Sequence, residues 1–106
     1  MISNLINDKG NKVKNQFVIK ATNATFFQSY DTMCAKFQNG VVYLNKDYFG
    51  EEYTSGSTTT RTHLHNFLYN HAYFARYECS AKEIRKLIKC GDIVMIGEEE
   101  LEITIS

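Results

Sequence analysis

The chain has 106 residues, of which 43% are hydrophobic and 23% charged, and twelve basic side chains balance twelve acidic ones. This length is typical of one domain with a modest core, and this composition excludes a chain that is disordered throughout. Because the formal net charge is zero, no global positive field draws the protein to nucleic acid or to an anionic membrane.

The first fourteen residues, MISNLINDKGNKVK, are mostly polar and predict a flexible lead with a turn near Asp8–Asn11. They lack the basic region and apolar run of a signal peptide, and no stretch of the chain reaches the ~18 apolar residues of a membrane span. We therefore expect a cytoplasmic protein without membrane contact, in which residues 15–106 form a single domain.

Alternation of apolar and polar side chains predicts strands over residues 16–21 and 25–30. The turn between them can be closed by two or by three residues, and these alternatives give different pairings. The sequence leaves this register open. Both strands belong to an antiparallel meander that continues to residue 45.

The clearest local signal is the segment 31–45, DTMCAKFQNGVVYLN. Asn39 and Gly40 form the dipeptide that a two-residue type I′ turn favours, because both turn positions need a positive φ. Folding about this turn predicts one register, with these cross-strand pairs: Phe37 with Val42, Ala35 with Leu44, Met33 with Lys46, Lys36 with Tyr43 and Cys34 with Asn45. One face is then mostly apolar, and a register shift of one residue would expose this face to solvent.

The second half of the chain is expected to supply helices that cover the sheet. Ser57–Thr60 offers hydroxyl N-caps for a helix that runs to about residue 70. Its apolar face has side chains three and four positions apart: Leu64, Phe67, Leu68 and His71. Ser80–Glu83 is a capping box for a second helix that ends at Gly91.

Three extended segments complete the prediction. Residues 72–79 alternate loosely and predict a strand or an extended loop, and strands are expected over residues 93–96 and 101–105. The predicted fold class is α+β: an antiparallel β-sheet, made of the meander and the C-terminal strands, with two short helices packed on one face.

Candidates for catalysis are the thiols and imidazoles: Cys34, Cys79, Cys90, His63, His65 and His71. No flanking pattern of a protease or transferase surrounds the cysteines, and glycine-rich phosphate loops and HExxH motifs are absent from the sequence. The three cysteines are an odd number at unrelated spacing, which predicts reduced thiols. We expect no enzymatic activity and no cofactor.

Candidates for a metal site are four closely spaced residues: His63, His65, His71 and Cys79. Two histidines two positions apart lie about 200° apart around a helix, so they do not share a face as HxxxH pairs do. We expect one surface and one interfacial histidine and no metal, and the sequence leaves a metal role of these four residues open.

Nucleic acid is an alternative partner. Four basic side chains are predicted on the outer face of the second helix, and three lysines could form an N-terminal basic arm. The helix residues are Lys82, Arg85, Lys86 and Lys89, and the arm residues are Lys9, Lys12 and Lys14. Against this, Glu83 interrupts the helix face and the net charge is zero.

Aromatic side chains are abundant, with seven Tyr and seven Phe. Those of the middle third are Tyr48, Phe49, Tyr53, Tyr69, Tyr73, Phe74 and Tyr77. They either form the core between sheet and helices or contribute to an interface, and a homodimer would also bury them. The partner-binding residues we expect are Tyr69, Tyr73, Phe74 and Tyr77, together with the acidic Glu98, Glu99 and Glu100.

Short motifs between residues 15 and about 96 carry a family resemblance: Asn15–Ile19, Thr25–Tyr30, Val42–Leu44, Tyr53, Ser57–Thr59, Phe67–Leu68, Ser80–Ile84 and Ile88–Gly91. In these motifs the chain resembles a family of small uncharacterised domains encoded by phages and mobile elements of low-GC bacteria. It departs from them over residues 70–79 and at its acidic end. The resemblance implies no activity and no catalytic residue, and it implies a bacterial host cell as the setting.

The function we expect is that of a small phage-type accessory protein that binds a host bacterial protein stoichiometrically. An anti-defence role, such as inhibition of a CRISPR nuclease, would use the acidic end to mimic nucleic-acid charge. The alternative is a nucleic-acid-binding regulator that uses the basic face of the second helix.

Overall fold

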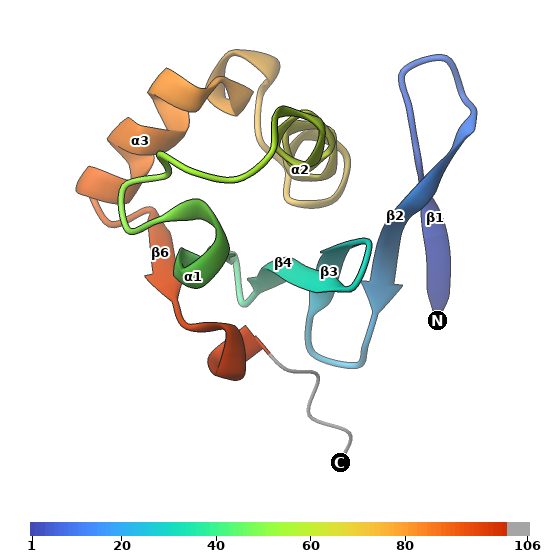
Figure 1. The fold of residues 1–106 in the computed structure, drawn as a ribbon, viewed down its shortest axis with the longest axis horizontal. Helices are drawn as coiled ribbons and strands as arrows, with labels where there is room; N and C mark the ends of the chain where they lie inside the picture. The colour runs from blue at the N-terminus through green and yellow to red at the C-terminus, as the bar shows by residue number, and fades with distance from the viewer. Residues whose placement is uncertain (102–106) are drawn as a thin grey trace.

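The computed structural model describes residues 1–101 (Figure 1). The strands are β1 (Ile2–Ile6), β2 (Lys12–Lys20), β3 (Thr25–Ser29), β4 (Thr32–Gln38), β5 (Val41–Asn45) and β6 (Ile93–Ile96). The helices are α1 (Lys46–Phe49), α2 (Thr58–His71) and α3 (Ala81–Lys89), with 3-10 helices η1 (Arg76–Cys79) and η2 (Glu98–Leu101). A further strand is predicted over residues 101–105. Leu101 instead ends η2, and residues 102–105 lie outside the described residues.

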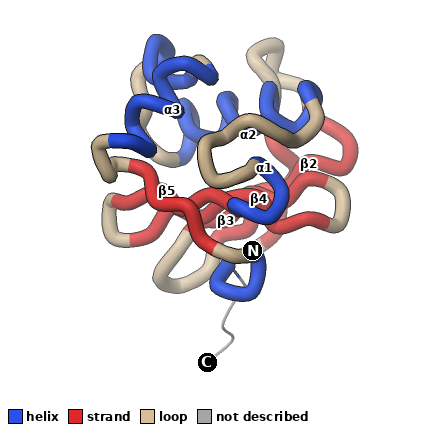
Figure 2. Tube along the Cα trace, turned by 60° about the vertical axis from the view of Figure 1, so that its left-hand side comes forward, coloured by secondary structure: helices blue, strands red, loops and turns tan. Residues whose placement is uncertain are grey.

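The strands form one sheet in the order β1-β2-β3-β4-β5-β6. The first five strands are an antiparallel meander, whereas β6 pairs parallel to β5, with Val42 opposite Ile93. Figures 1 and 2 show α2 and α3 over one face of this sheet. The predicted α+β class is therefore confirmed, although the last described strand is parallel and not antiparallel.

The turn of the β4–β5 hairpin has the predicted form, with φ +52° at Asn39 and +78° at Gly40. The three inner cross-strand pairs are confirmed: Ala35 with Leu44, Lys36 with Tyr43 and Phe37 with Val42. The pair of Met33 with Lys46 is wrong, because Asn45 caps α1 there by accepting from the backbone N–H of Tyr48 at 3.1 Å.

Cys34 and Asn45, the other outer pair of the prediction, are also not paired in the ladder. The register between β3 and β4 shifts after Phe27, so Cys34 is an extra residue in its strand. This bulge places both Cys34 and Ala35 in the core, fully buried.

The N-terminal residues differ from the predicted flexible lead. Ile2–Ile6 forms β1, which pairs with β2, and Leu5 is fully buried in the core. The turn between these strands is closed by Asn7, whose side-chain oxygen accepts from the backbone N–H of Lys9 and of Asn11, both at 3.0 Å. A bulge between Asn4 and Ile6 breaks the apolar alternation that would otherwise have marked this strand.

The core lies between the sheet and the two longer helices. Leu64, Phe67 and Leu68 of α2 are fully buried, as predicted, and Phe67 stacks on Phe27 of β3 at 5.6 Å between ring centroids. Ile84 is the fully buried residue of α3. A contiguous apolar core thus holds α2 and α3 against the meander.

Both helices begin at the predicted caps. The side chain of Ser57 accepts from the N–H of Thr60, and that of Ser80 accepts from the N–H of Glu83. The segment 72–79 is no strand, because it ends in the 3-10 helix η1. Within residues 1–101, none of the helices has the length and apolar character needed to cross a membrane.

Candidate binding surfaces

The aromatic residues of the middle third divide into two groups. Phe49 and Tyr53 are fully buried, and Tyr48 and Phe74 pack against the core, so these four hold the fold together. The exposed group is Tyr69, Tyr73 and Tyr77, with 39%, 87% and 74% of their surfaces accessible. Of the four tyrosine and phenylalanine residues predicted to bind a partner, three are thus exposed. We call residues 69–77 the tyrosine loop.

Tyr73 is held outward by the way α2 ends. Ala72 is the C-cap, and the backbone N–H groups of Ala72 and Phe74 both donate to the carbonyl of Leu68, at 3.2 and 3.1 Å. This turn gives Tyr73 a φ of +62°. Glycine is the usual residue in that conformation, and another residue there costs roughly 1–3 kcal/mol. The strain turns Phe74 toward the core and Tyr73 toward solvent.

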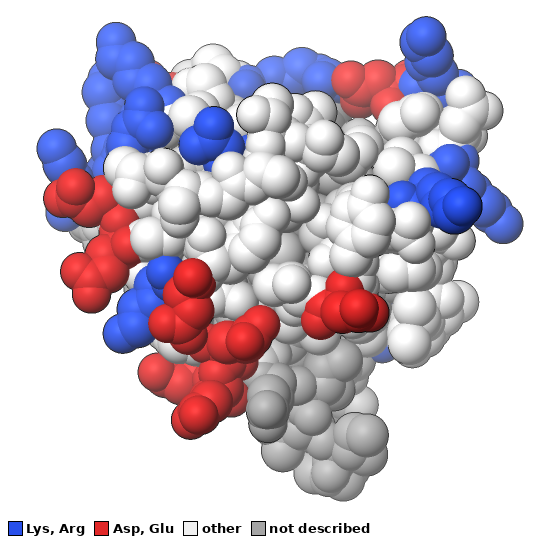
Figure 3. Space-filling model, viewed as in Figure 1, with Lys and Arg blue, Asp and Glu red and all other residues white. Residues whose placement is uncertain are grey.

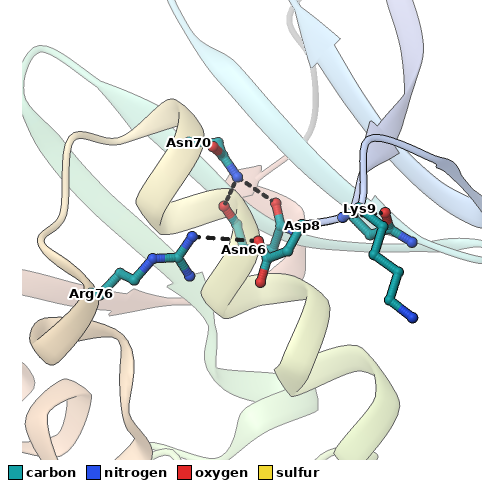
Figure 4. A network of polar contacts seen from close by, with 6 residues as sticks. Asp8, Lys9, Asn66, Asn70 and Arg76 are labelled. Carbon is teal, nitrogen blue, oxygen red and sulfur yellow. Dashed lines mark hydrogen bonds and ion pairs between the residues drawn. The ribbon is translucent and has the colours of Figure 1, made fainter.

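Tyr69 and Arg76 form a stacked pair across the tyrosine loop. The guanidinium carbon of Arg76 lies 4.1 Å from the ring centroid of Tyr69, and the same guanidinium lies 3.6 Å from the carboxylate of Asp8. The Asp8 carboxylate raises the pKa of Arg76. Arg76 therefore connects the tyrosine loop to the turn between β1 and β2 (Figure 4).

A cleft of about 530 Å³ lies between that turn, the exposed side of α2, and η1. We call it the hairpin cleft. His63 and His65 both line it, at opposite edges of the strip of α2 that it exposes, together with Asn66 and Cys79. Within residues 1–101 no three potential ligands lie close enough to hold a metal ion.

A protein-family model described as "Family of unknown function (DUF8033)" matches residues 1–86 of the chain. The chain belongs to this family. The DUF8033 match includes the tyrosine loop and the hairpin cleft, whereas η2 lies beyond it. Searches of curated proteins and of solved structures gave no match.

The buried thiols of this DUF8033 chain are poor nucleophiles. Burial raises the pKa of Cys34 to about 12 and also raises the pKa of Cys79, whose sulfur lies 3.4 Å from the carbonyl oxygen of Ala75. Cys90 is exposed at the end of α3, 3.3 Å from an Asp92 carboxylate oxygen. Thiolate chemistry is therefore disfavoured at Cys34 and Cys79.

Burial also lowers the pKa of all three histidines of the DUF8033 chain, which keeps the neutral form at pH 7. His71 stacks on Phe67 at 5.5 Å, away from the cleft-lining residues. The buried Tyr53 positions His65, because its hydroxyl oxygen lies 3.1 Å from Nε2 of His65. The sequence placed Tyr53 among the aromatic residues of the core or of an interface, but it did not predict the contact with His65, because nothing near Tyr53 in the chain marks it as the partner of a helix residue.

Acidification is expected to destabilise the fold. The histidine pKa values are below their ordinary 6.5 in the folded chain, so the unfolded chain binds more protons below about pH 6.5. Urea denaturation should therefore give a lower free energy of unfolding at about pH 5.5 than at about pH 7.5. His65→Gln should flatten this dependence, and equal stability at both pH values would contradict it.

The basic residues of α3 form one stripe. Lys82, Arg85, Lys86 and Lys89 are three and four positions apart, and Figure 3 shows Lys and Arg side chains gathered over this helix at the upper left. Glu83 pairs with Lys86 at 3.5 Å. Lys12 and Lys14 belong to β2 and Lys9 to the hairpin turn, so the predicted basic arm is instead part of the first hairpin.

The acidic end is separated from the tyrosine loop. Glu98, Glu99 and Glu100 form the first turn of η2, which packs beneath the sheet while α2 lies above it (Figure 1). Asp47 accepts from the backbone N–H of Glu98 at 2.9 Å, and Lys36 donates to the carbonyl of Glu100 at 3.4 Å. The structure therefore divides the predicted partner-binding residues between two surfaces.

Proposed function

We propose that this chain is a non-enzymatic accessory protein that binds another protein stoichiometrically, with the tyrosine loop as the contact surface. The observation that carries the proposal is Tyr73, which is 87% exposed and held at a φ of +62°. Tyr30 is also exposed at a positive φ, but Tyr73 differs in lying near a second exposed tyrosine, Tyr77, and backbone strain gathers at functional sites.

The neighbours of Tyr73 have the chemistry of an interface. Tyr77 is 74% exposed, and Arg76 is preoriented by its stacking on Tyr69. Tyrosine and arginine are the residue types that dominate binding energy at protein interfaces, since each combines apolar area with hydrogen bonding. The ring of Tyr73 contacts Phe37 on one side, with 5.8 Å between the ring centroids, and leaves most of its surface open to a partner.

The resemblance to domains of phages and mobile elements supports a host bacterial protein in the cytoplasm as the partner. We assign the chain an anti-defence role, in which it inhibits a nuclease such as a CRISPR effector. Glu98, Glu99 and Glu100 supply negative charge that suits a nucleic-acid-binding surface. Because η2 and the tyrosine loop lie on opposite sides of the sheet, we assign the tyrosine loop the anchoring contact and η2 a separate electrostatic one.

The proposal is tested by affinity capture of the tagged chain from a bacterial host lysate, with nuclease treatment and mass spectrometry. We expect one protein in near-equal amount, retained after nuclease and lost with the double variant Tyr73→Ala, Tyr77→Ala. Tyr30→Ala is the matched control, because Tyr30 is also exposed and at positive φ but lies outside the tyrosine loop. It should capture the partner normally.

Several outcomes would decide against this surface. Full capture by the double variant would exclude the tyrosine loop, and so would its unfolding, since the two side chains would then be structural. A chain that captures only its own second copy, with a doubled mass in light scattering, would replace the host partner by a homodimer.

The α3 stripe favours a second candidate, a nucleic-acid-binding regulator. Lys82, Arg85, Lys86 and Lys89 follow one helical face, as in helices that contact a phosphate backbone. In this case the captured material would be nucleic acid, or proteins lost on nuclease treatment. The charge reversal Arg85→Glu, Lys86→Glu would then abolish capture, whereas the tyrosine variants would not.

A further inference from the structure

The hairpin cleft is lined by charged and hydrogen-bonding side chains from three separate elements. Arg76 comes from η1, Lys9 from the hairpin turn, and His63, His65 and Asn66 from α2. At pH 7 the histidines are neutral, so the charges that line the cleft are two cations and the carboxylate of Asp8. The cleft therefore carries a net positive charge in a chain that is neutral overall.

Arg76 is preoriented and only partly engaged. Its flat guanidinium stacks on Tyr69, and its one ion pair within residues 1–101 is the 3.6 Å contact with Asp8. Both side chains of this pair are more than half exposed, at 63% and 66%. An exposed pair of this kind is weak, and a guanidinium has five N–H donors, so an incoming anion can replace Asp8.

Asn66 adds a neutral donor to the same wall. The side-chain amide of Asn70 donates to the side-chain oxygen of Asn66 at 2.7 Å and to its backbone carbonyl at 3.0 Å. These bonds engage both oxygens of Asn66 (Figure 4), and among residues 1–101 no hydrogen bond uses its side-chain N–H groups, which can donate to a ligand. The Asx turn at Asn7 likewise fixes the backbone that carries Asp8 and Lys9.

The volume of the cleft and the separation of its two cations indicate the kind of ligand that fits. Lys9 extends away from Arg76 (Figure 4), so the two cations lie at separate points of the cleft. A volume of about 530 Å³ is within the ~300–1,000 Å³ of small-molecule sites and is far more than one inorganic ion fills. These features favour an organic anion over a single small ion.

We propose that the hairpin cleft binds a small organic molecule with phosphate or carboxylate groups, that Arg76 is its main anion contact, and that Asp8 is a built-in competitor for that contact. This site goes beyond the proposed protein binding and does not depend on it. Arg76 provides the paired N–H donors that fit both phosphate and carboxylate, and removal of Asp8 would free them.

The test is a titration of the pure, full chain followed by ¹H–¹⁵N NMR, with adenosine 5′-monophosphate, citrate and inorganic phosphate as separate probes. We expect saturable shifts at the hairpin turn and α2 with the organic anions, and the probe that binds tighter identifies phosphate or carboxylate as the preferred group. Arg76→Ala should weaken binding by about tenfold or more, and Asp8→Asn should tighten it several-fold. Arg85→Ala, on α3, is the matched control and should leave the affinity unchanged.

The opposite effects of the two cleft variants make the test decisive. Nonspecific attraction would weaken equally in Arg76→Ala and Arg85→Ala, which would overturn the proposal. No saturable shift with any probe up to about 10 mM would also overturn it. If Arg76→Ala fails to fold, Asp8→Asn still tests the site, because tighter binding with shifts confined to the hairpin turn and α2 is expected only if the anion binds beside Asp8. Capture of a protein partner is tested separately, with the Tyr73 and Tyr77 variants, because neither of these two residues lines the cleft.

Discussion

Phe67→Ala is expected to lower the free energy of unfolding by about 3–5 kcal/mol, a large part of the ~5–15 kcal/mol typical of a domain. Phe67 is fully buried, and its ring stacks on Phe27 at 5.6 Å and on His71 at 5.5 Å. Truncation removes the ring from between α2 and β3 and leaves a cavity that the rigid sheet cannot close. Urea denaturation followed by circular dichroism measures the loss.

Tyr77→Ala is the control for this measurement. It also removes an aromatic ring, but that ring is 74% exposed, so the stability should stay within about 0.5 kcal/mol of the wild type. A loss below about 1 kcal/mol for Phe67→Ala would mean that α2 does not pack on the sheet as the structure shows.

Gly56→Ala is expected to lower the free energy of unfolding by about 2–4 kcal/mol. Gly56 has a φ of +95°, and an added Cβ would lie 2.8 Å from a ring carbon of Tyr48 and 3.1 Å from one of Phe49. The Tyr48 ring cannot move away freely, because its hydroxyl accepts from the backbone N–H of Ser57 at 3.1 Å. Displacing it would disturb the residue that caps α2.

Gly91→Ala separates the backbone strain of an alanine at positive φ from the steric contact of its added Cβ. Gly91 has a similar φ of +87°, but nothing lies within 4 Å of its added Cβ, so it reports the backbone strain alone. We expect about 1 kcal/mol for it in the same denaturation experiment. Equal losses for the two variants would show that the Tyr48 contact contributes nothing.

The features that the sequence predicted correctly are decided by residues near one another in the chain. The register of the β4–β5 hairpin follows from Asn39 and Gly40, and the start of α3 follows from Ser80, whose side chain accepts from the N–H of Glu83. In each case the residues that form the bond or the turn are at most three positions apart, and no distant segment competes with them.

The errors arose where a distant segment decides the outcome. The bulge at Cys34 is imposed by pairing with β3, and β1 exists because β2 provides its partner and the core buries Leu5. Periodicity within a strand carries no information about such partners. The sequence did not predict β1 for this reason.

The candidate sites were predictable only in part. Sequence composition indicated surplus aromatic residues, but which of them face solvent depends on the positive φ of Tyr73, where no glycine marks the turn. The hairpin cleft was not predicted, because Asp8 and Arg76 meet only after the first hairpin has folded against η1. The one available signal was an arginine placed among tyrosines.

The parallel pairing of β5 with β6 bears on the order of folding. Each earlier strand joins its neighbour through a short turn, whereas β6 can pair with β5 only after residues 46–92 have been brought round as one closed loop. Closing a loop of that length in place of a two-residue turn costs on the order of 3 kcal/mol in chain entropy. The antiparallel meander can therefore assemble early from local contacts, while β6 joins late, after α2 and α3 have shortened the loop by packing on the sheet.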